Sequence, residues 1–331
     1  MKLCFGTLLT RGSIAAALAL MGAMLPHVAH AGLIAYEPFN YAAGSNLDAK
    51  TGGTGWTSSW GPKLVPVGPA IPVAGAVIQA GSLAAPVGLP TLGGHVRMSA
   101  ENGAFEMARS FPNVPGTAGT NTWYSFLGQR IGSNAGGTNW PNNPYPRGAN
   151  MGLFDKDVVA QGGTNYERVG VGNSTTVNGV DAAHYDEWSL IPQGSGTLRE
   201  GPASHSPKWS ELAWAVLRIE HVGDATVADN MWLWLNPDPL GGEPLTANAA
   251  VTILNGDTNS RDISNVDYIR PFLGAAQNVG NAATSRPAAV MLIDEIRLGT
   301  GWDDMRATPE PATGVLVTLA GIALTARRKR R

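Results

Sequence analysis

The chain almost lacks cysteine, because Cys4 is the only one among 331 residues. Charged residues are also scarce, at 15%, and the middle of the chain has no sustained run of apolar residues at helical spacing. If the N-terminal segment that contains Cys4 is removed, no thiol remains, which excludes disulfides, thiolate metal sites and cysteine nucleophiles. The missing helical periodicity argues against a helical protein.

Glycine, proline and tryptophan are abundant instead, with 42 Gly, 23 Pro and 10 Trp, and hydrophobic residues make up 44% of the chain. A chain with this much apolar side chain buries a core, so intrinsic disorder is excluded. Glycine does not recur at every third residue as it does in collagen, so the excess of turn-forming residues indicates many tight connections. The composition therefore predicts an all-β protein.

The N-terminal 31 residues have the three parts of a secretory signal peptide. Lys2 and Arg11 come before an uncharged apolar stretch at 14–25, and Ala29 and Ala31 provide the small residues of a cleavage site. A membrane anchor is the alternative, but this stretch is shorter than the roughly 20 residues that a spanning helix needs. We therefore predict a signal peptide at 1–31, cleaved after Ala31.

The C-terminal 23 residues combine three features in a fixed order. A Pro-Glu-Pro triplet is followed by a mostly apolar segment at 312–326 and then by a basic cluster at 327–331. The residues concerned are Pro309, Glu310 and Pro311, and Arg327, Arg328, Lys329, Arg330 and Arg331. The apolar segment is short for a bilayer, and the cations would keep the end of the chain on the cytoplasmic side.

This combination resembles a PEP-CTERM sorting tail. The resemblance implies export through the secretion machinery and transient anchoring in the inner membrane. It also implies recognition by an exosortase, a membrane peptidase that cuts near the triplet and releases the protein to the cell surface or the extracellular matrix. An ordinary tail anchor is the alternative, but it has no need of the triplet.

Without the two ends, the body at 32–308 keeps 16 basic and 24 acidic residues, a net charge of -8. An acidic body argues against nucleic-acid binding, which needs a basic face. It is compatible with calcium. We find no linker in this body and predict one domain.

Runs with strand character recur along the body and are separated by Gly, Asn, Pro and Thr clusters. The predicted strands are 33–39, 95–99, 105–109, 121–131, 151–154, 168–171, 214–221, 230–235, 266–272 and 290–298. The segment 62–94 has six prolines and a single charge, so it cannot form a continuous central strand. We expect it to run extended over the domain and to cover an edge or a mouth.

Several short motifs resemble the concanavalin A-like, laminin-G-like jelly rolls that often precede PEP-CTERM tails. They are Leu33–Tyr41, Gly52–Trp56 with Trp60, Trp123–Phe126, Trp234–Pro237 and Ile293–Gly299. The resemblance implies a two-sheet antiparallel jelly-roll sandwich, a fold shared by lectins, glucanases and adhesion modules. The fold alone therefore leaves the function open.

Asp294 is the first candidate for a functional residue. Alternation along 290–298 places it on the same face as Val290, Leu292, Ile296 and Leu298, where a lone ionised carboxylate is costly. The first and last strands of jelly rolls lie side by side, which makes Glu37 a possible second ligand of a structural calcium ion. Hydrogen bonds or a salt bridge are the alternative.

Trp232 and Trp234 are the second candidate, because alternation places both on one face of the predicted strand 230–235. Two rings about 7 Å apart, from two residues at roughly 3.3 Å each, would suit stacking on a sugar chain. The alternative is that the two rings pack between the sheets or under the proline-rich segment. Trp140, Trp188 and Trp209 lie in predicted loops and are independent candidates.

No catalytic motif is found, although the same fold hosts glucanases that use two carboxylates. The E-x-D-x-E strand that the resemblance would predict is absent, and the adjacent acids Asp294 and Glu295 would point to opposite faces of a strand. The sequence thus predicts an exported, non-catalytic surface or matrix protein that is adhesive or associated with extracellular polysaccharide. A glycoside hydrolase with a dispersed carboxylate pair and a purely structural matrix protein are the alternatives.

Overall fold

The computed structural model describes residues 32–61, 75–100, 105–131, 149–155, 167–173, 187–192, 199–200, 207–223, 227–257, 260–273 and 290–307. The predicted signal peptide, with Ala29 and Ala31, and the predicted sorting tail at 309–331 lie outside these residues. Within the described residues, no helix is long and apolar enough to cross a bilayer.

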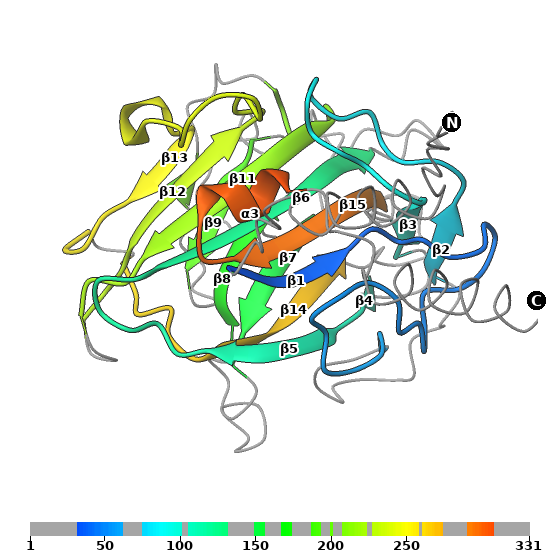
Figure 1. Cartoon of the computed structure of the whole chain (residues 1–331), viewed down its shortest axis with the longest axis horizontal. Helices are drawn as coiled ribbons and strands as arrows, with labels where there is room; N and C mark the ends of the chain where they lie inside the picture. The colour runs from blue at the N-terminus through cyan, green and yellow to red at the C-terminus, as the bar shows by residue number, and fades with distance from the viewer. Residues whose placement is uncertain are drawn as a thin grey trace, which may run out of the picture. The chain divides into compact units, whose positions relative to one another are not determined.

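Two antiparallel sheets form the body (Figure 1). Sheet A has eight strands in the order β13-β12-β11-β6-β15-β3-β2, with β1 also paired to β15, and sheet B has seven in the order β10-β9-β8-β7-β14-β4, with β5 also paired to β14. The strands of sheet A are β1 (Leu33–Glu37), β2 (Ala76–Gln79), β3 (His95–Ser99), β6 (Asn121–Ile131), β11 (Ala213–Glu220), β12 (Asn230–Leu235), β13 (Val251–Ile253) and β15 (Val290–Gly299). Those of sheet B are β4 (Phe105–Glu106), β5 (Arg109–Val114), β7 (Ala149–Phe154), β8 (Glu167–Asn173), β9 (Ser189–Pro192), β10 (Arg199–Glu200) and β14 (Val266–Leu273). The prediction of an all-β, two-sheet antiparallel sandwich is confirmed.

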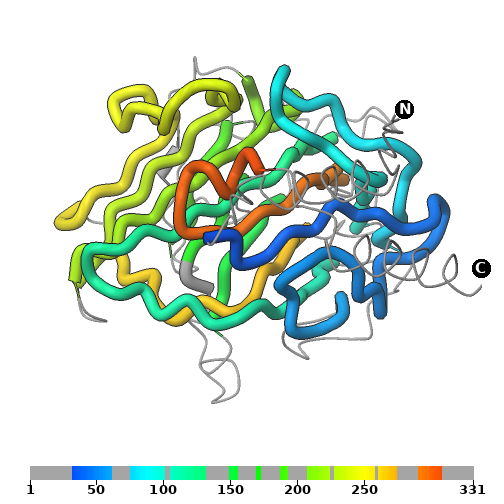
Figure 2. Tube along the Cα trace, in the orientation of Figure 1, coloured from blue at the N-terminus to red at the C-terminus, as the bar shows by residue number. Residues whose placement is uncertain are grey.

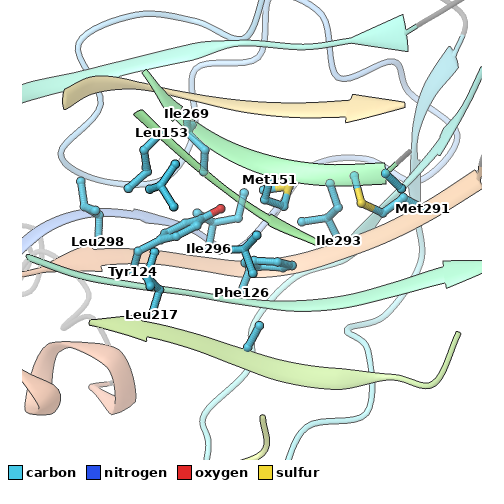
Figure 3. Close-up of a cluster of buried hydrophobic side chains, with 14 of the residues drawn as sticks. Tyr124, Phe126, Met151, Leu153, Leu217, Ile269, Met291, Ile293, Ile296 and Leu298 are labelled. Atoms are coloured by element: carbon cyan, nitrogen blue, oxygen red, sulfur yellow. The ribbon is translucent and has the colours of Figure 1, made fainter. Parts of the chain in front are cut away.

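The core lies between the two sheets because alternate side chains of each strand point to the same side. Figure 3 shows Tyr124 and Phe126 of sheet A facing Met151 and Leu153 of sheet B. All four are at most 1% exposed. Burial of such side chains, worth roughly 1.5–3 kcal/mol each, is the main force that holds the sheets together.

The first and last strands of the body are neighbours, as the motifs predicted. In the tube view, the blue segment of β1 runs beside the orange segment of β15 (Figure 2), and Leu33 pairs with Gly299. The Gly52–Trp56 motif packs directly on β1. Gly55 has a φ of +78°, and a Cβ there would lie 1.9 Å from the carbonyl oxygen of Ile34, so only glycine fits.

The described part of the proline-rich segment has two roles. Ala76–Gln79 forms the edge strand β2, a position that tolerates the prolines around it. Residues Gly81–Gly94, here called the cover segment, run over the outer face of sheet A, with Leu83 and Leu89 packed against the side chains of that face. The expectation of a covering segment is confirmed for these residues, but they cover the outer face of sheet A and not an edge or a mouth.

A short C-terminal helix, α3 (Trp302–Arg306), follows β15 and was not expected from the sequence. Asp304 accepts hydrogen bonds from the backbone N–H groups of Thr300 and Gly301, which caps the start of the helix. The Trp302 ring packs against the rings of Trp123 and Trp214 on the outer face of sheet A.

Candidate functional site

The outer face of sheet A carries a second apolar cluster, separate from the core between the sheets. Tryptophans from β6, β11, β12 and α3 gather there under the cover segment. Its buried members are Leu89, Trp123, Leu127, Trp214, Val216, Trp232, Trp234, Trp302 and Met305. This face is therefore a covered surface.

Trp232 and Trp234 lie in this cluster, and they do not form an exposed platform. Their exposed fractions are 9% and 2%. Trp234 stacks on Trp123 with ring centroids 5.8 Å apart, and its Nε1 donates a hydrogen bond to the carbonyl oxygen of Leu245 at 2.9 Å. The observed arrangement is the alternative in which the tryptophans pack under the proline-rich segment.

Two other tryptophans, expected in loops as independent candidates, belong to the core. Trp188 and Trp209 have ring centroids 3.9 Å apart and are at most 2% exposed. Trp140, the third of these candidates, lies outside the described residues. The sequence offered no signal for the burial of the first two, because neither lies in a predicted strand.

A bulge interrupts β15 between Asp294 and Arg297, where the register of pairing to β6 shifts. Glu295 within the bulge has a φ of 51°, which is unusual for a residue with a side chain. Met291 and Ile293 belong to the core before the bulge, and Ile296 and Leu298 after it. The predicted assignment of side chains to the two faces is thus wrong for the first half of β15. The extra residue of the bulge shifts the alternation between the two halves of the strand.

The bulge places three charged side chains under the cover segment, all of them fully buried. The Leu83 N–H donates to Asp294 Oδ2 at 2.9 Å, and the Leu92 N–H donates to Glu295 Oε1 at 2.6 Å. Arg297 Nη2 donates to the Pro90 carbonyl oxygen at 2.7 Å. The charges of the bulge therefore hold the cover segment in place at three points.

The electrostatics of the bulge are unusual because two carboxylates share one guanidinium. Burial, together with the neighbouring Glu295, raises the pKa of Asp294 to about 8. Burial also raises the pKa of Glu295, although Arg297 Nη2 and the Tyr36 hydroxyl both donate to its Oε2, at 2.7 and 2.8 Å. Within the described residues, Nε and Nη1 of Arg297 have no hydrogen-bond partner.

Glu37 points to the opposite face of sheet A. It pairs with Ile296, whose side chain is in the core, whereas Asp294 pairs with Leu127, which lies in the outer cluster. The Glu37 carboxylate forms an ion pair with Arg109, fully buried like itself, and accepts hydrogen bonds from Trp60 Nε1, the Tyr41 hydroxyl and the Phe39 N–H. Burial raises the pKa of Glu37, while the Arg109 guanidinium acts to lower it.

The predicted calcium site of Glu37 and Asp294 is therefore wrong. The two carboxylates lie on opposite faces of one sheet, and each is already bound by protein donors. Among the described residues, no group of three or more His, Cys, Asp and Glu side chains is placed to hold a metal ion. For both residues, the alternative of hydrogen bonds or a salt bridge is what the structure contains.

A buried array of Thr122, His221 and Asp229 was not singled out in the sequence. Thr122 Oγ1 lies 2.8 Å from His221 Nε2, and His221 Nδ1 lies 3.1 Å from Asp229 Oδ2. Because a carboxylate only accepts, Nδ1–H donates to it, and a neutral ring then accepts from the threonine hydroxyl. All three side chains are 1% exposed, and Asp229 also accepts from the Ile263 N–H, so the array cross-links β6, β11 and the segment before β14.

A pocket of about 510 Å³ lies beside this array, between the starts of β1 and β6 and the end of β5. Its apolar lining includes Ile34 and Val114. Pro112, Pro115 and Gly116 also line it. Six neutral side chains that can form hydrogen bonds complete the lining: Asn113, Thr117, Thr120, Asn121, Thr122 and Thr300. No charged residue in the described part of the chain lines it.

No protein-family model matches the chain, and no curated protein matches its sequence. Among solved structures, an endo-1,3-β-glucanase from Streptomyces sioyaensis is similar over 81% of this chain and 95% of its own, at 10% identity and a TM-score of 0.46. An immunostimulatory antigen and pseudo β-1,3-glucanase of Mycobacterium tuberculosis is similar over 82% and 99%, at 11% identity and a TM-score of 0.44. An endo-β-1,4-glucuronan lyase from Trichoderma reesei is similar over 80% and 96%, at 10% identity and a TM-score of 0.40.

Proposed function

We propose that this protein is exported, sorted by an exosortase at Pro309–Pro311, and acts as a non-catalytic component of the cell surface or extracellular matrix. The observation that carries the proposal is the order of triplet, apolar segment and basic cluster within the last 23 residues. The segment 312–326 would hold the chain in the inner membrane until it is cut near the triplet.

The state of the buried carboxylates supports a non-catalytic role. A glycoside hydrolase needs two carboxyl groups that face one bond across an open cleft. Glu37, Asp294 and Glu295 are fully buried, and each is bound by donors of the protein itself. Glu187, which follows Asp186 in the sequence, is 2% exposed and forms an ion pair with Lys208.

We further propose that the body associates with extracellular polysaccharide at the neutral pocket rather than at the tryptophans. Hydroxyl and amide side chains such as Asn113, Thr117 and Thr300 match the hydroxyl groups of a neutral sugar, and the apolar lining residues suit the face of its ring. The volume of about 510 Å³ is within the usual range for small-ligand sites.

Sorting is tested by expressing the full chain in a host with an exosortase and following where it accumulates. We expect the intact chain to lose its tail and to appear at the surface or in the medium. A Pro309→Ala, Pro311→Ala double variant should stay in the membrane fraction with its tail, as mass spectrometry would show. The matched control Asp303→Asn, just before the triplet, should be released normally. Equal release of the double variant would contradict the sorting proposal.

Polysaccharide association is tested by affinity electrophoresis in gels that contain neutral glucans. We expect retention of the full chain, weakened by Asn113→Ala with Thr117→Ala and unchanged by the control Asn255→Ala, at an exposed residue that does not line the pocket. Unchanged retention in the pocket variant would reject the pocket, and no retention of any variant would favour a purely structural matrix protein.

A carbohydrate-active enzyme is the second candidate, because the same fold hosts glucanases. The samples used for retention should also be assayed for new reducing ends and for the absorbance of unsaturated sugars. Release of either product would replace the non-catalytic proposal with a hydrolase or a lyase.

A further inference from the structure

Three strongly exposed apolar side chains lie on the segments that surround α3. Val87 of the cover segment is 88% exposed, and Leu240 and Leu245, in the loop between β12 and β13, are 70% and 69% exposed. The other large apolar residues that are exposed among the described ones range from 37% to 46%. Apolar side chains exposed this far mark a contact surface when they are grouped.

Contacts connect the segments that carry these residues to α3. The Leu245 carbonyl oxygen accepts from Trp234, which stacks on Trp123, and Trp123 packs against Trp302 of α3. Gly88 lies against Leu240, because a Cβ at that glycine would come within 2.6 Å of the leucine side chain. Arg306 Nη1 donates to the carbonyl oxygens of Pro239 and Gly241, at 3.2 and 2.8 Å, so Leu240 is held beside the last turn of α3. The cyan cover segment and the orange helix lie over the same face of sheet A (Figure 1).

The chain that follows α3 is too short to let this surface turn away from a membrane. Only residues 308–311 separate Ala307 from the apolar segment that begins at Ala312. Fully extended, the five Cα–Cα steps span at most about 18 Å, and the headgroup region of one leaflet takes about 5–8 Å of that distance. A domain of this size has a radius of gyration of about 19 Å, so the side around α3 stays closest to the bilayer.

We propose that Val87, Leu240 and Leu245 form a membrane-facing patch that rests on the lipid surface while the tail is anchored. The inference rests on the proposed function, because it takes 312–326 to be inserted in the membrane. Apolar side chains at the boundary between headgroups and acyl chains gain from burial in the same way as those of interfacial helices. The contact would keep the Pro309–Pro311 triplet at the level of the headgroups, where a membrane peptidase acts.

The test uses the full chain with Cys4→Ser, reconstituted in vesicles of phosphatidylethanolamine and phosphatidylglycerol at three to one. A single cysteine is introduced as Leu240→Cys and labelled with a polarity-sensitive fluorophore. The matched control is Leu254→Cys, at a residue 43% exposed in the turn after β13. Asn255 of that turn donates from its N–H to Asn230, at the opposite end of β12 from the Leu240 loop.

We expect the label at position 240 to emit at shorter wavelength on flotation with vesicles. We also expect lipids with nitroxides near the headgroup to quench it several-fold more strongly than the label at position 254. Equal quenching at both positions, in protein that floats with the vesicles, would overturn the membrane-facing patch and leave the tail anchor intact. Protein that does not float would overturn both the anchor and the patch.

Discussion

Each face of sheet A contains a buried carboxylate, and the two carboxylates are stabilised in different ways. On the inner face, the buried carboxylate of Glu37 has Arg109 as counter-ion and three further donors. On the outer face, Asp294 has two backbone N–H donors, from Leu83 and Glu295, and an acidic neighbour. The inner centre is a charge-balanced part of the core, whereas the outer centre uses its hydrogen bonds to hold the cover segment.

Removal of the counter-ion on the inner face should have the largest effect. Arg109→Leu leaves Glu37 buried without its cation, and breaking a buried ion pair from one side costs about 3–5 kcal/mol. Urea denaturation should therefore show a fall of this size in the free energy of unfolding. Replacement of both partners, as Glu37→Gln with Arg109→Leu, should recover part of the loss. If Arg109→Leu alone were as stable as the parent, the ion pair between Glu37 and Arg109 would not stabilise the fold.

The outer face should respond to pH through Asp294. Its pKa is raised from 3.8 to about 8, so the folded protein keeps a proton that the unfolded chain loses above pH 4. The free energy of unfolding should fall as the pH rises between these values, by at most about 2 kcal/mol from pH 5 to pH 6.5 at 1.36 kcal/mol per unit. Asp294→Asn should flatten this dependence in urea titrations at several pH values, and the exposed-site variant Asp303→Asn should not.

Two tyrosines allow a matched comparison of the faces. The Tyr36 hydroxyl donates to Glu295 and the Tyr41 hydroxyl donates to Glu37. Tyr36→Phe should lower the free energy of unfolding by about 1.5 kcal/mol, the low end for a hydrogen bond to a charged group. Tyr41→Phe should cost less, because Tyr41 is partly exposed and water can replace the hydroxyl. A larger loss of unfolding free energy for Tyr41→Phe than for Tyr36→Phe would contradict the prediction that the tyrosine hydrogen bond on the outer face contributes more to stability.

The smallest effect is expected for an ion pair that has no buried partner. Asp303 pairs with Arg306 on α3, and its side chain is 69% exposed. Asp303→Asn should change the free energy of unfolding by less than about 1 kcal/mol in thermal or chemical melts, since exposed pairs contribute little. A larger change would mean that the helix is more tightly coupled to sheet A than its exposure indicates.

Much of the fold followed from alternation along the strands. The segments 121–131, 230–235 and 95–99 were predicted with the bounds of β6, β12 and β3, because each is a long run of strand formers ended by turn residues. The pairing of β1 with β15 followed from motif resemblance. The short strands β2, β9, β10 and β13 were missed, since two to four residues are too few to show a period. Of β5, only Arg109 was predicted to be in a strand.

The site was harder to predict because its features depend on contacts between distant segments. The bulge at Glu295 shifts the alternation of side chains along β15, and no residue type in the strand predicts a bulge there. The partner of Glu37 is 72 residues away, and the sequence alone could not choose between Arg109 and a metal ion. The burial of Trp232 and Trp234 depends on a covering segment whose proline content indicated an extended path but not the face that it covers.

The position of β15 also has a consequence for the order in which the sandwich can be completed. It is the last strand of the body, yet it lies inside sheet A, between β6 and β3, with β1 paired to it as well. Until β15 pairs with β6 and β3, the strands β2 and β3 are separated from the half of the sheet that contains β6, β11, β12 and β13. A chain that leaves a ribosome or a translocation channel N-terminus first would thus remain open until nearly all of it has emerged. Non-local strand pairing of this kind is slow to form, which favours passage through a channel before folding.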